Sequence, residues 1–133
     1  MWAVCRRPSG VGSVDENFQR MRFPLTSQAP SRARHWADGV MTLHPDVQAT
    51  VILLLSELVA NSVRHSGCPP ADEVDVAIRQ VGTTIHVEVR DPGAGEGIEP
   101  SETLEHAGLR IVQSLSDRWG VRHDPTTVWF DVG

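Results

Sequence analysis

The 133-residue sequence is poor in cysteine and lacks any pair of cysteines spaced for zinc or redox chemistry. Its two cysteines, Cys5 and Cys68, lie far apart in unrelated contexts, without a CxxC motif. This pattern argues against a disulfide framework and is typical of proteins in a reducing cytosol. We therefore expect Cys68, which precedes two prolines, to be chemically inert.

Long apolar runs are lacking as well. The first residues, Met1 to Pro8, include arginines but no apolar run long enough for a signal peptide. No stretch approaches the length that crosses a bilayer. These absences predict a cytoplasmic protein that does not contact a membrane.

Basic residues are outnumbered by acidic ones. With 12 Lys and Arg against 17 Asp and Glu, the formal net charge is -5. A general nucleic-acid binder needs a basic face, so we expect no direct contact with nucleic acid. The length is that of one domain with a hydrophobic core.

The strongest pattern in the chain is an amphipathic helix over residues 44–65. His44 and Pro45 open it, and Gly67 with two prolines behind it ends it. Apolar side chains recur at steps of three and four residues, as on one buried side of a helix. That side comprises Val51, Leu54, Leu55, Leu58, Val59, Ser62 and Val63.

Three polar residues, Glu57, Asn61 and Arg64, stack beside this buried side. An unpaired polar group in an apolar interior costs about 2–7 kcal/mol on transfer scales. A carboxylate and a carboxamide one turn apart at the margin of the core therefore indicate that a polar partner lies there. For Arg64, a cation favoured by the helix macrodipole explains the residue almost as well as a phosphate contact.

The segments before this helix are less regular. Residues 1–20 show no period and predict a flexible extension, so that the domain spans residues 21–133. Residues 22–26 suit a short edge strand, where a proline is tolerated. Ser31 is expected to cap a first helix that Gly39 closes.

Alternating apolar residues after the long helix predict two antiparallel strands joined by a short turn. Their inward positions are Val74, Val76, Ile78, Ile85, Val87 and Val89. Asp91 continues this inward alternation, which places its carboxylate on the buried side at the end of the strand. An aspartate that only opens a turn before Pro92 and Gly93 is common. The inward position favours the other interpretation, in which the Asp91 carboxylate accepts a hydrogen bond from a bound donor. The glycine-rich loop 91–97 allows a ligand to approach the backbone, and residues 96–106 predict a mobile lid.

Another helix is predicted over residues 108–115, with free amides at its start that suit phosphate oxygens. Gly108 alone is weak evidence, since many helices begin with glycine for packing reasons. Two final strands occupy residues 118–122 and 126–132. This order predicts an α+β fold, with helices on one face of a mixed, mainly antiparallel sheet.

Three motifs in this order resemble the nucleotide-binding boxes of the GHKL ATPases, which include gyrase and the histidine kinases. Glu57–Asn61 resembles their N box, Asp91–Gly95 their D-x-G-x-G box and Ala107–Leu109 their second glycine box. Three boxes in register are far more specific than one. The segments S-E-L-V-x-N-x-V-R-H, V-R-D-x-G and D-R-W-G-V further resemble the stand-alone branch of anti-sigma-factor serine/threonine kinases. The resemblance implies the two-layer Bergerat ATP-binding fold.

The resemblance also implies a role for each matched residue. Asn61 would bind Mg²⁺ together with ATP phosphates and water, and Glu57 would be the catalytic base that accepts the proton of the attacking hydroxyl. Asp91 would accept the adenine amino proton, and Thr126 would help to hold the adenine through water. The implied nucleotide-binding residues are Asn61, Arg64, Asp91, Gly93, Gly95, Gly108, Leu109, Arg110 and Thr126.

The second glycine box departs from the family pattern G-x-G-L. His106 replaces its first glycine, and Ala107 stands where the kinase branch often has arginine. Pro125 replaces the glycine that usually precedes the last strand's threonine. These departures bear on phosphate affinity and turnover more than on adenine binding.

Three functions fit this sequence. The first is an ATP-dependent kinase that holds a sigma factor and phosphorylates its antagonist, an anti-anti-sigma protein of the STAS type. The second is a non-catalytic, nucleotide-responsive module that sequesters a regulatory partner. A detached histidine-kinase catalytic domain is the weakest, because no dimerisation helix with a phosphorylated histidine fits in residues 1–22. The sequence does not decide whether the protein forms a homodimer, since Trp36 alone does not establish one.

Overall fold

The structure of the chain is a computed structural model that describes residues 18–93, 107–122 and 126–133. Helices and strands of the described part mix along the chain, as expected for an α+β protein. Their order is β1 (Phe18–Pro24), α1 (Ala29–Val40), α2 (Pro45–His65), β2 (Glu73–Val81), β3 (Thr84–Arg90), α3 (Ala107–Leu115), β4 (Arg118–Arg122) and β5 (Thr127–Val132).

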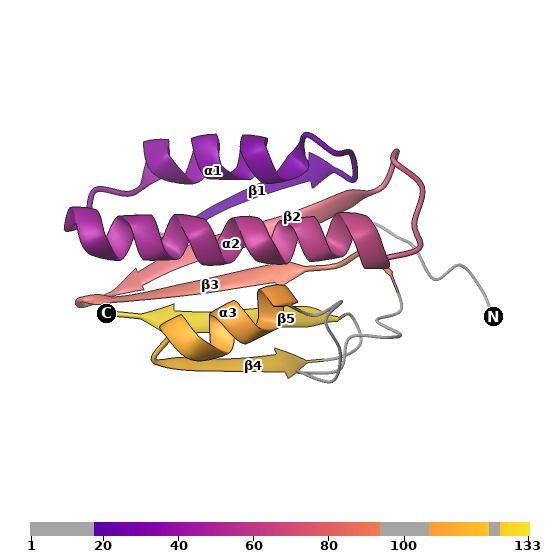
Figure 1. Cartoon of the computed structure of the whole chain (residues 1–133). Coiled ribbons are helices and arrows are strands. Elements are labelled where there is room, and N and C mark those ends of the chain that lie inside the picture. Colours follow the sequence, from indigo (N-terminus) through magenta and orange to yellow (C-terminus); the bar gives the residue numbers. More distant parts are fainter. Residues whose placement is uncertain (1–17, 94–106, 123–125) are drawn as a thin grey trace.

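The strands form one sheet in the order β1-β2-β3-β5-β4. The helices cover one face of this sheet, with α1 and α2 side by side and α3 near β4 and β5 (Figure 1). The predicted α+β fold with helices on one face is confirmed. Every pairing between the described strands is antiparallel, so the parallel pair implied by a mixed sheet is not found among them.

The core lies between the helices and the inner face of the sheet. Along β3 buried residues alternate with more exposed ones, because successive side chains of a strand point to opposite faces. In β2 and β5 the alternation is interrupted, since Asp75 and Thr127 are buried as well. Each fully buried aliphatic side chain stabilises the fold by about 1.5–3 kcal/mol. The largest fully buried side chains include Leu54, Leu55, Val74, Val76, Ile85, Val87 and Phe130.

Helix α2 is the long helix predicted from the sequence. It begins at Pro45, and the Nδ1 atom of His44 accepts a hydrogen bond from the Asp46 amide at 3.3 Å. It ends at His65, and Gly67 follows with a φ of +74°, a conformation that glycine adopts without strain.

The composition of α2 corrects one expectation. By length and composition alone this helix is able to cross a membrane, since a window within it has a mean hydropathy of 1.3. The expectation that no stretch approaches membrane-spanning length is therefore wrong. The finding is weak evidence for a span, because the core helix of a soluble domain passes the same test, and 44% of that window is buried inside the fold.

Helix α1 extends beyond both of its predicted ends. It spans Ala29–Val40, so that Ser31 lies within its first turn and Gly39 within its last. Pro30 occupies the first turn, where its missing amide hydrogen is not needed. Three alanines spaced four residues apart are fully buried along one side of the helix. Packing of this alanine face extends the helix past the residues that the sequence indicates as its ends.

Strand β1 begins at Phe18, within the predicted extension of residues 1–20. The Nε atom of Arg20 donates hydrogen bonds to both carboxylate oxygens of Asp75, at 2.9 and 2.8 Å. The guanidinium carbon of Arg79 lies 5.1 Å from the centre of the Phe18 ring. Both partners belong to β2, so distant pairing orders a segment that has no period of its own. The rest of the predicted extension lies outside the described residues.

Cys68 corrects a further expectation. The described residues include no free cysteine, and Cys68 is disulfide-bonded. The prediction that it forms no disulfide is therefore wrong. Whether two cysteines meet is decided by the path of the folded chain, which their spacing in the sequence does not reveal.

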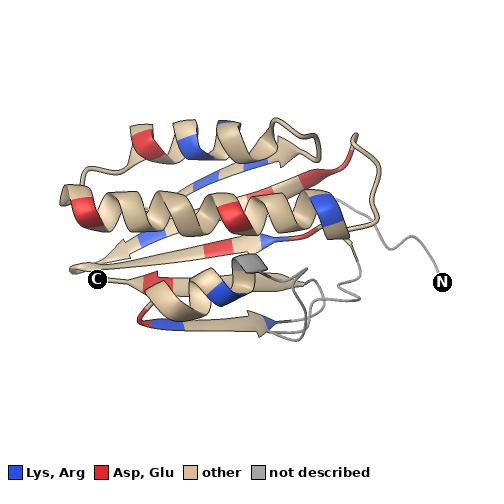
Figure 2. Ribbon diagram, viewed as in Figure 1, with Lys and Arg blue, Asp and Glu red and all other residues tan. Residues whose placement is uncertain are grey.

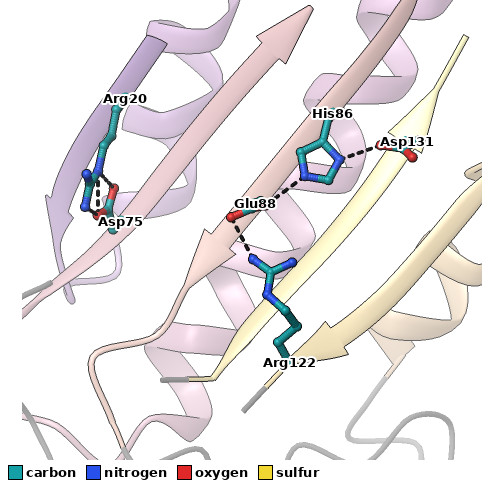
Figure 3. Close-up of polar contacts among 6 residues, drawn as sticks. All are labelled: Arg20, Asp75, His86, Glu88, Arg122 and Asp131. Atoms are coloured by element: carbon teal, nitrogen blue, oxygen red, sulfur yellow. Dashed lines mark hydrogen bonds and ion pairs between the residues drawn. The ribbon is translucent and has the colours of Figure 1, made fainter. Parts of the chain in front are cut away.

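The outer face of the sheet, which the helices leave uncovered, carries a network of ion pairs (Figure 3). His86 lies between two carboxylates, with Nδ1 2.5 Å from Asp131 Oδ1 and Nε2 2.8 Å from Glu88 Oε2. Arg122 adds a contact of 2.9 Å to the other oxygen of Glu88. Acidic and basic residues are interspersed along the described helices and strands (Figure 2).

Glu88 is the centre of this network. Burial raises the pKa of its carboxyl, but hydrogen bonds from His86 and Arg122 lower it by more, so the pKa lies below its ordinary value of 4.5. Because the pKa is lower in the folded state than in the unfolded state, the ionised carboxylate stabilises the fold above pH 4.5. This contribution is lost as the pH falls through the lowered pKa.

We expect Glu88→Gln to lower the free energy of unfolding by about 1 kcal/mol at neutral pH, since the glutamine loses the charge that His86 and Arg122 stabilise. The difference from the wild type should disappear as the pH falls through the lowered pKa of Glu88. Urea unfolding at a series of pH values measures both quantities.

The matched control is Glu73→Gln. Glu73 is a partly buried carboxylate of β2 that makes no ion pair with any described residue, so its substitution should leave the network around Glu88 intact. A loss for Glu88→Gln that keeps its full size in acid would contradict the assigned network.

Candidate functional site

A narrow cavity lies between the C-terminal half of α2 and the adjacent ends of β3 and β5. It has a volume of about 20 Å³. Apolar side chains line most of it, and buried polar side chains converge in the remaining part. The lining residues are Leu58, Asn61, Ser62, His65, Val89, Asp91, Leu109, Thr126 and Val128.

Asp91 directly follows β3 and is only 4% exposed. Its amide donates a hydrogen bond to the carbonyl oxygen of Thr126 at 2.9 Å, which joins the end of β3 to the start of β5. Its carboxylate accepts two hydrogen bonds, from the Gly93 amide to Oδ1 at 2.7 Å and from the Ser62 hydroxyl to Oδ2 at 2.8 Å. The inward position predicted for Asp91 is confirmed. The same carboxylate also accepts the amide hydrogen of Gly93 in the turn that follows β3.

The environment of Asp91 shifts its titration. Burial raises the pKa of the carboxyl above its ordinary value of 3.8, and the hydrogen bonds from Gly93 and Ser62 lower it only in part. Burying an ionised carboxylate away from water is costly unless donors surround it. A further hydrogen-bond donor would therefore stabilise the ionised form of the Asp91 carboxylate.

Thr126 faces the same cavity from the start of β5. Its side chain is fully buried, and its hydroxyl oxygen makes no hydrogen bond with any described residue. A buried polar atom without a partner costs about 1–3 kcal/mol. An unpartnered hydroxyl beside the Asp91 carboxylate is therefore the feature of a site that completes its hydrogen bonds with a ligand or water.

Asn61 lies on α2 at the rim of the cavity and is 6% exposed. Its side-chain oxygen accepts a hydrogen bond from Nη2 of Arg64 at 2.7 Å. This is the oxygen that the sequence motif assigns to Mg²⁺. The described residues contain no cluster of three or more His, Cys, Asp or Glu side chains that could hold a metal ion by themselves. A metal held here would therefore take most of its oxygens from water and from a ligand.

Glu57 lies one helical turn before Asn61, as predicted, but it does not line the cavity. It lines a separate open groove between α1 and α2, together with residues such as Arg34 and Asp38. Its carboxylate is partly buried and makes no hydrogen bond or ion pair with any described side chain. The carboxylate is thus available to accept a proton.

The predicted glycine boxes are described only in part. Gly95, the lid of residues 96–106 and His106 lie outside the described residues. Gly108 and Leu109 belong to the first turn of α3, and Leu109 reaches the cavity. Arg110 is exposed on the same helix. The structure thus brings Leu109 to Asp91 and Thr126, whereas the side chain of Arg110 stays at the surface.

The profile of the histidine kinase-like ATPase domain matches residues 23–131 of the chain. The chain belongs to the histidine kinase-like ATPase family. The match covers every helix and strand described above except residues 18–22 of β1 and Val132 of β5. A search of curated protein sequences found no match.

The fold of this ATPase domain resembles a solved structure, the crystal structure of the RsbU and RsbW domains of Rv1364c from Mycobacterium tuberculosis. The TM-score is 0.67 at 17% sequence identity. The similarity covers 86% of this chain and 31% of that chain, so the ATPase domain spans about a third of its length. At this identity the likeness shows the shared fold alone.

The residues of the cavity fit the adenine of ATP in their chemistry. A carboxylate accepts hydrogen bonds, which suits the amino group of adenine, and the unpartnered Thr126 hydroxyl offers a further polar contact. The cavity volume of about 20 Å³ holds about one water molecule. A purine ring therefore requires the walls to separate, and α3, which contributes only Leu109 to the lining, is the smallest wall to displace.

Ser62 is the residue of this ATPase site that the sequence motifs do not indicate. It immediately follows Asn61, and its helical period places it with the apolar residues of the buried side. The hydrogen bond to Asp91, 29 residues away, appears only in the folded structure. A small polar residue among the aliphatic ones on a buried helix face is the signal that could have revealed it, because such a hydroxyl needs a partner.

We expect Gly93→Ala to disturb the site, because a Cβ at this position would lie 2.8 Å from the Ser66 carbonyl oxygen and 3.0 Å from Asp91 Oδ1. The backbone carbonyl cannot rotate away as a flexible side chain would. Overpacking of this kind costs about 1–3 kcal/mol of unfolding free energy. Thermal and urea unfolding measure the loss.

The matched control is Gly39→Ala within α1, where a Cβ meets no atom within 4 Å. This variant should be as stable as the wild type or more stable by up to about 1 kcal/mol, since alanine favours helix. Equal stability of both alanine variants would show that the turn at Gly93 has room for a side chain.

Proposed function

We propose that this ATPase domain is an ATP-dependent protein serine/threonine kinase that phosphorylates a STAS-type anti-anti-sigma partner and so regulates the availability of a sigma factor. The observation that carries the proposal is the buried Asp91 carboxylate beside the unpartnered Thr126 hydroxyl, in a cavity of a histidine kinase-like ATPase domain. These two groups support recognition of a purine that offers an amino group.

Nucleotide binding would use groups on three elements. Asp91 would accept the adenine amino proton, and the amides of residues 108–110 at the start of α3 would contact phosphate oxygens. Asn61 would place its side-chain oxygen on Mg²⁺, which neutralises phosphate charge when bound. Because Arg64 now donates to that oxygen, Arg64 must release Asn61 and is then free to contact phosphate.

Phosphoryl transfer would use Glu57 as the base. The hydroxyl oxygen of the partner's serine or threonine forms a bond to the γ-phosphorus, and the bond from that phosphorus to the β–γ bridging oxygen breaks. The hydroxyl proton passes to the Glu57 carboxylate, which leaves ADP and the phosphorylated partner. Glu57 lines the open groove between α1 and α2, which supports access of a protein substrate to it.

The partners are inferred from two likenesses. The sequence motifs resemble the anti-sigma-factor kinase branch, and the similar solved structure contains an RsbW domain. We infer that the sigma factor and the STAS protein bind the same ATPase domain in turn. A homodimer and a cytoplasmic location remain part of this proposal.

A second candidate is a nucleotide-responsive module that sequesters its partner without phosphoryl transfer. The hydrogen bond from Arg64 to Asn61 favours it, because the oxygen needed for the metal is already engaged. The departure of His106 and Ala107 from the second glycine box favours it as well.

A transfer assay separates the two candidates. The purified protein is incubated with γ-labelled ATP, Mg²⁺ and a STAS-domain protein, and label on the partner is measured. We expect transfer by the wild type, and a loss of at least about 100-fold in Glu57→Gln, because a general base contributes about 10²–10⁴-fold. Nucleotide affinity should be unchanged in this variant.

Asp46→Asn is the matched control, since Asp46 is an exposed carboxylate in the first turn of the same helix. It should transfer label at the wild-type rate. ATP binding by the wild type without any transfer would reject the kinase and leave the sequestering module. Loss of ATP binding in Glu57→Gln would reject Glu57 as the base.

We expect Asp91→Asn to lower ATP affinity by at least about tenfold, because the adenine amino group loses a charged acceptor. The isosteric asparagine keeps an oxygen for the Gly93 amide, so the fold should persist. A raised folded-state pKa means that the carboxyl favours folding below pH 3.8 and that this contribution is lost as the pH rises through the folded pKa. The variant should therefore be at least as stable as the wild type at neutral pH. Calorimetric titration with Mg²⁺·ATP and urea unfolding test both statements, and unchanged ATP affinity would contradict the role of Asp91.

A further inference from the structure

The hydroxyl of Ser62 is the one side-chain donor that the described structure gives to Asp91. We propose that Ser62 determines the base specificity of the nucleotide site, by holding Asp91 as a hydrogen-bond acceptor that takes an adenine amino group and rejects the oxygen of guanine at the same position. This inference rests on the proposed nucleotide binding. It assigns a role to Ser62, which lies outside the three sequence boxes.

The geometry fixes the direction of this hydrogen bond. Ser62 Oγ lies 2.8 Å from Asp91 Oδ2, and both side chains are buried, at 3% and 4% exposure. An ionised carboxylate only accepts hydrogen bonds, so the hydroxyl must donate to it. The Gly93 amide donates to the other oxygen at 2.7 Å. With a donor on each oxygen, Asp91 has lone pairs left for a ligand but no hydrogen to offer it.

Removal of the Ser62 donor would change what Asp91 presents. Burial already favours the protonated carboxyl, and the donors from Gly93 and Ser62 oppose this. A protonated Asp91 carries an O–H group and is able to donate to the oxygen of guanine. Adenine, which offers a donor at that position, would then meet an uncharged carboxyl oxygen, a weaker acceptor than the carboxylate. Ser62 therefore separates adenine from guanine through the protonation state of Asp91.

The other groups around the cavity do not replace Ser62. His65 of α2 is the only other titratable side chain that lines the described cavity. From β5 the neutral Thr126 faces Asp91, and from α3 the apolar Leu109 does. The donor from Gly93 is a backbone amide that no side-chain substitution removes. His65 is present in the wild type and in the serine variants alike, so a difference between them reports on the Ser62 donor to Asp91.

Helix α2 offers a matched control. Ser56 is buried on the same helix at 5% exposure, and its hydroxyl donates to the Leu53 carbonyl oxygen at 2.9 Å, away from the cavity. Ser56→Ala removes the same atom from the same helix as Ser62→Ala. Only Ser62→Ala removes a donor from Asp91.

The experiment measures the affinity for ATP and for GTP, each with Mg²⁺, from acid to neutral pH. For Ser62→Ala we expect the ratio of ATP affinity to GTP affinity to fall about tenfold, which corresponds to about 1.4 kcal/mol. The loss of ATP binding in acid should also begin at a higher pH than in the wild type. Ser56→Ala should match the wild type in both measurements, and Ser62→Thr, which keeps a hydroxyl, should restore the ratio.

An unchanged ratio and an unchanged acid midpoint in Ser62→Ala, with ATP still bound, would overturn the inference and leave the proposed function intact. A wild type that binds neither nucleotide would instead overturn the proposed function. If Ser62→Ala does not fold, Ser62→Cys keeps the volume with a weaker donor and should shift the ratio in the same direction. A wild-type ratio in Ser62→Cys would then reject the role of the Ser62 donor.

Discussion

The buried carboxylate of Asp91 is the group on which the arrangement of the site depends. Its backbone is bonded to Thr126 at the start of β5, and its side chain is bonded to Ser62 of α2 and to the turn at Gly93. One residue thus connects the long helix, two neighbouring strands and a loop. Burial raises the pKa of this carboxyl, and the hydrogen bonds from Gly93 and Ser62 lower it in part.

The two faces of the sheet differ in the kind of side chain that they carry. The inner face is apolar and packs against the helices, which supplies most of the stability through burial. On the outer face, His86 of β3 contacts Asp131 of the neighbouring strand β5 and Glu88 of its own strand, and Glu88 also contacts Arg122 of β4 (Figure 3). The buried hydroxyl of Thr126, which makes no hydrogen bond with any described residue, lies instead in the cavity beneath α2, together with Asp91.

Much of the fold could be predicted from the sequence, because its strands alternate clearly and its long helix has clear ends. The ends of α1 could not be predicted, since a buried alanine face extends the helix through Gly39. The start of β1 depended on Arg20 and its partner in β2, which local patterns do not show. The disulfide of Cys68 depends on the path of the folded chain, which periodicity does not report. The apolar length of α2, by contrast, is a property of its composition, so the sequence alone could have shown it.

The sequence by itself determined the family boxes, the helical stacking of Glu57 with Asn61 and the inward parity of Asp91, because these follow from the fixed periods of helices and strands. Only the tertiary structure decided which of these polar groups meet. It joined Ser62 and Thr126 to Asp91, turned Asn61 toward Arg64 and placed Glu57 in a different groove. The physical reason is that a period fixes the face on which a side chain lies, whereas its partner is chosen by the packing of elements far apart in the chain.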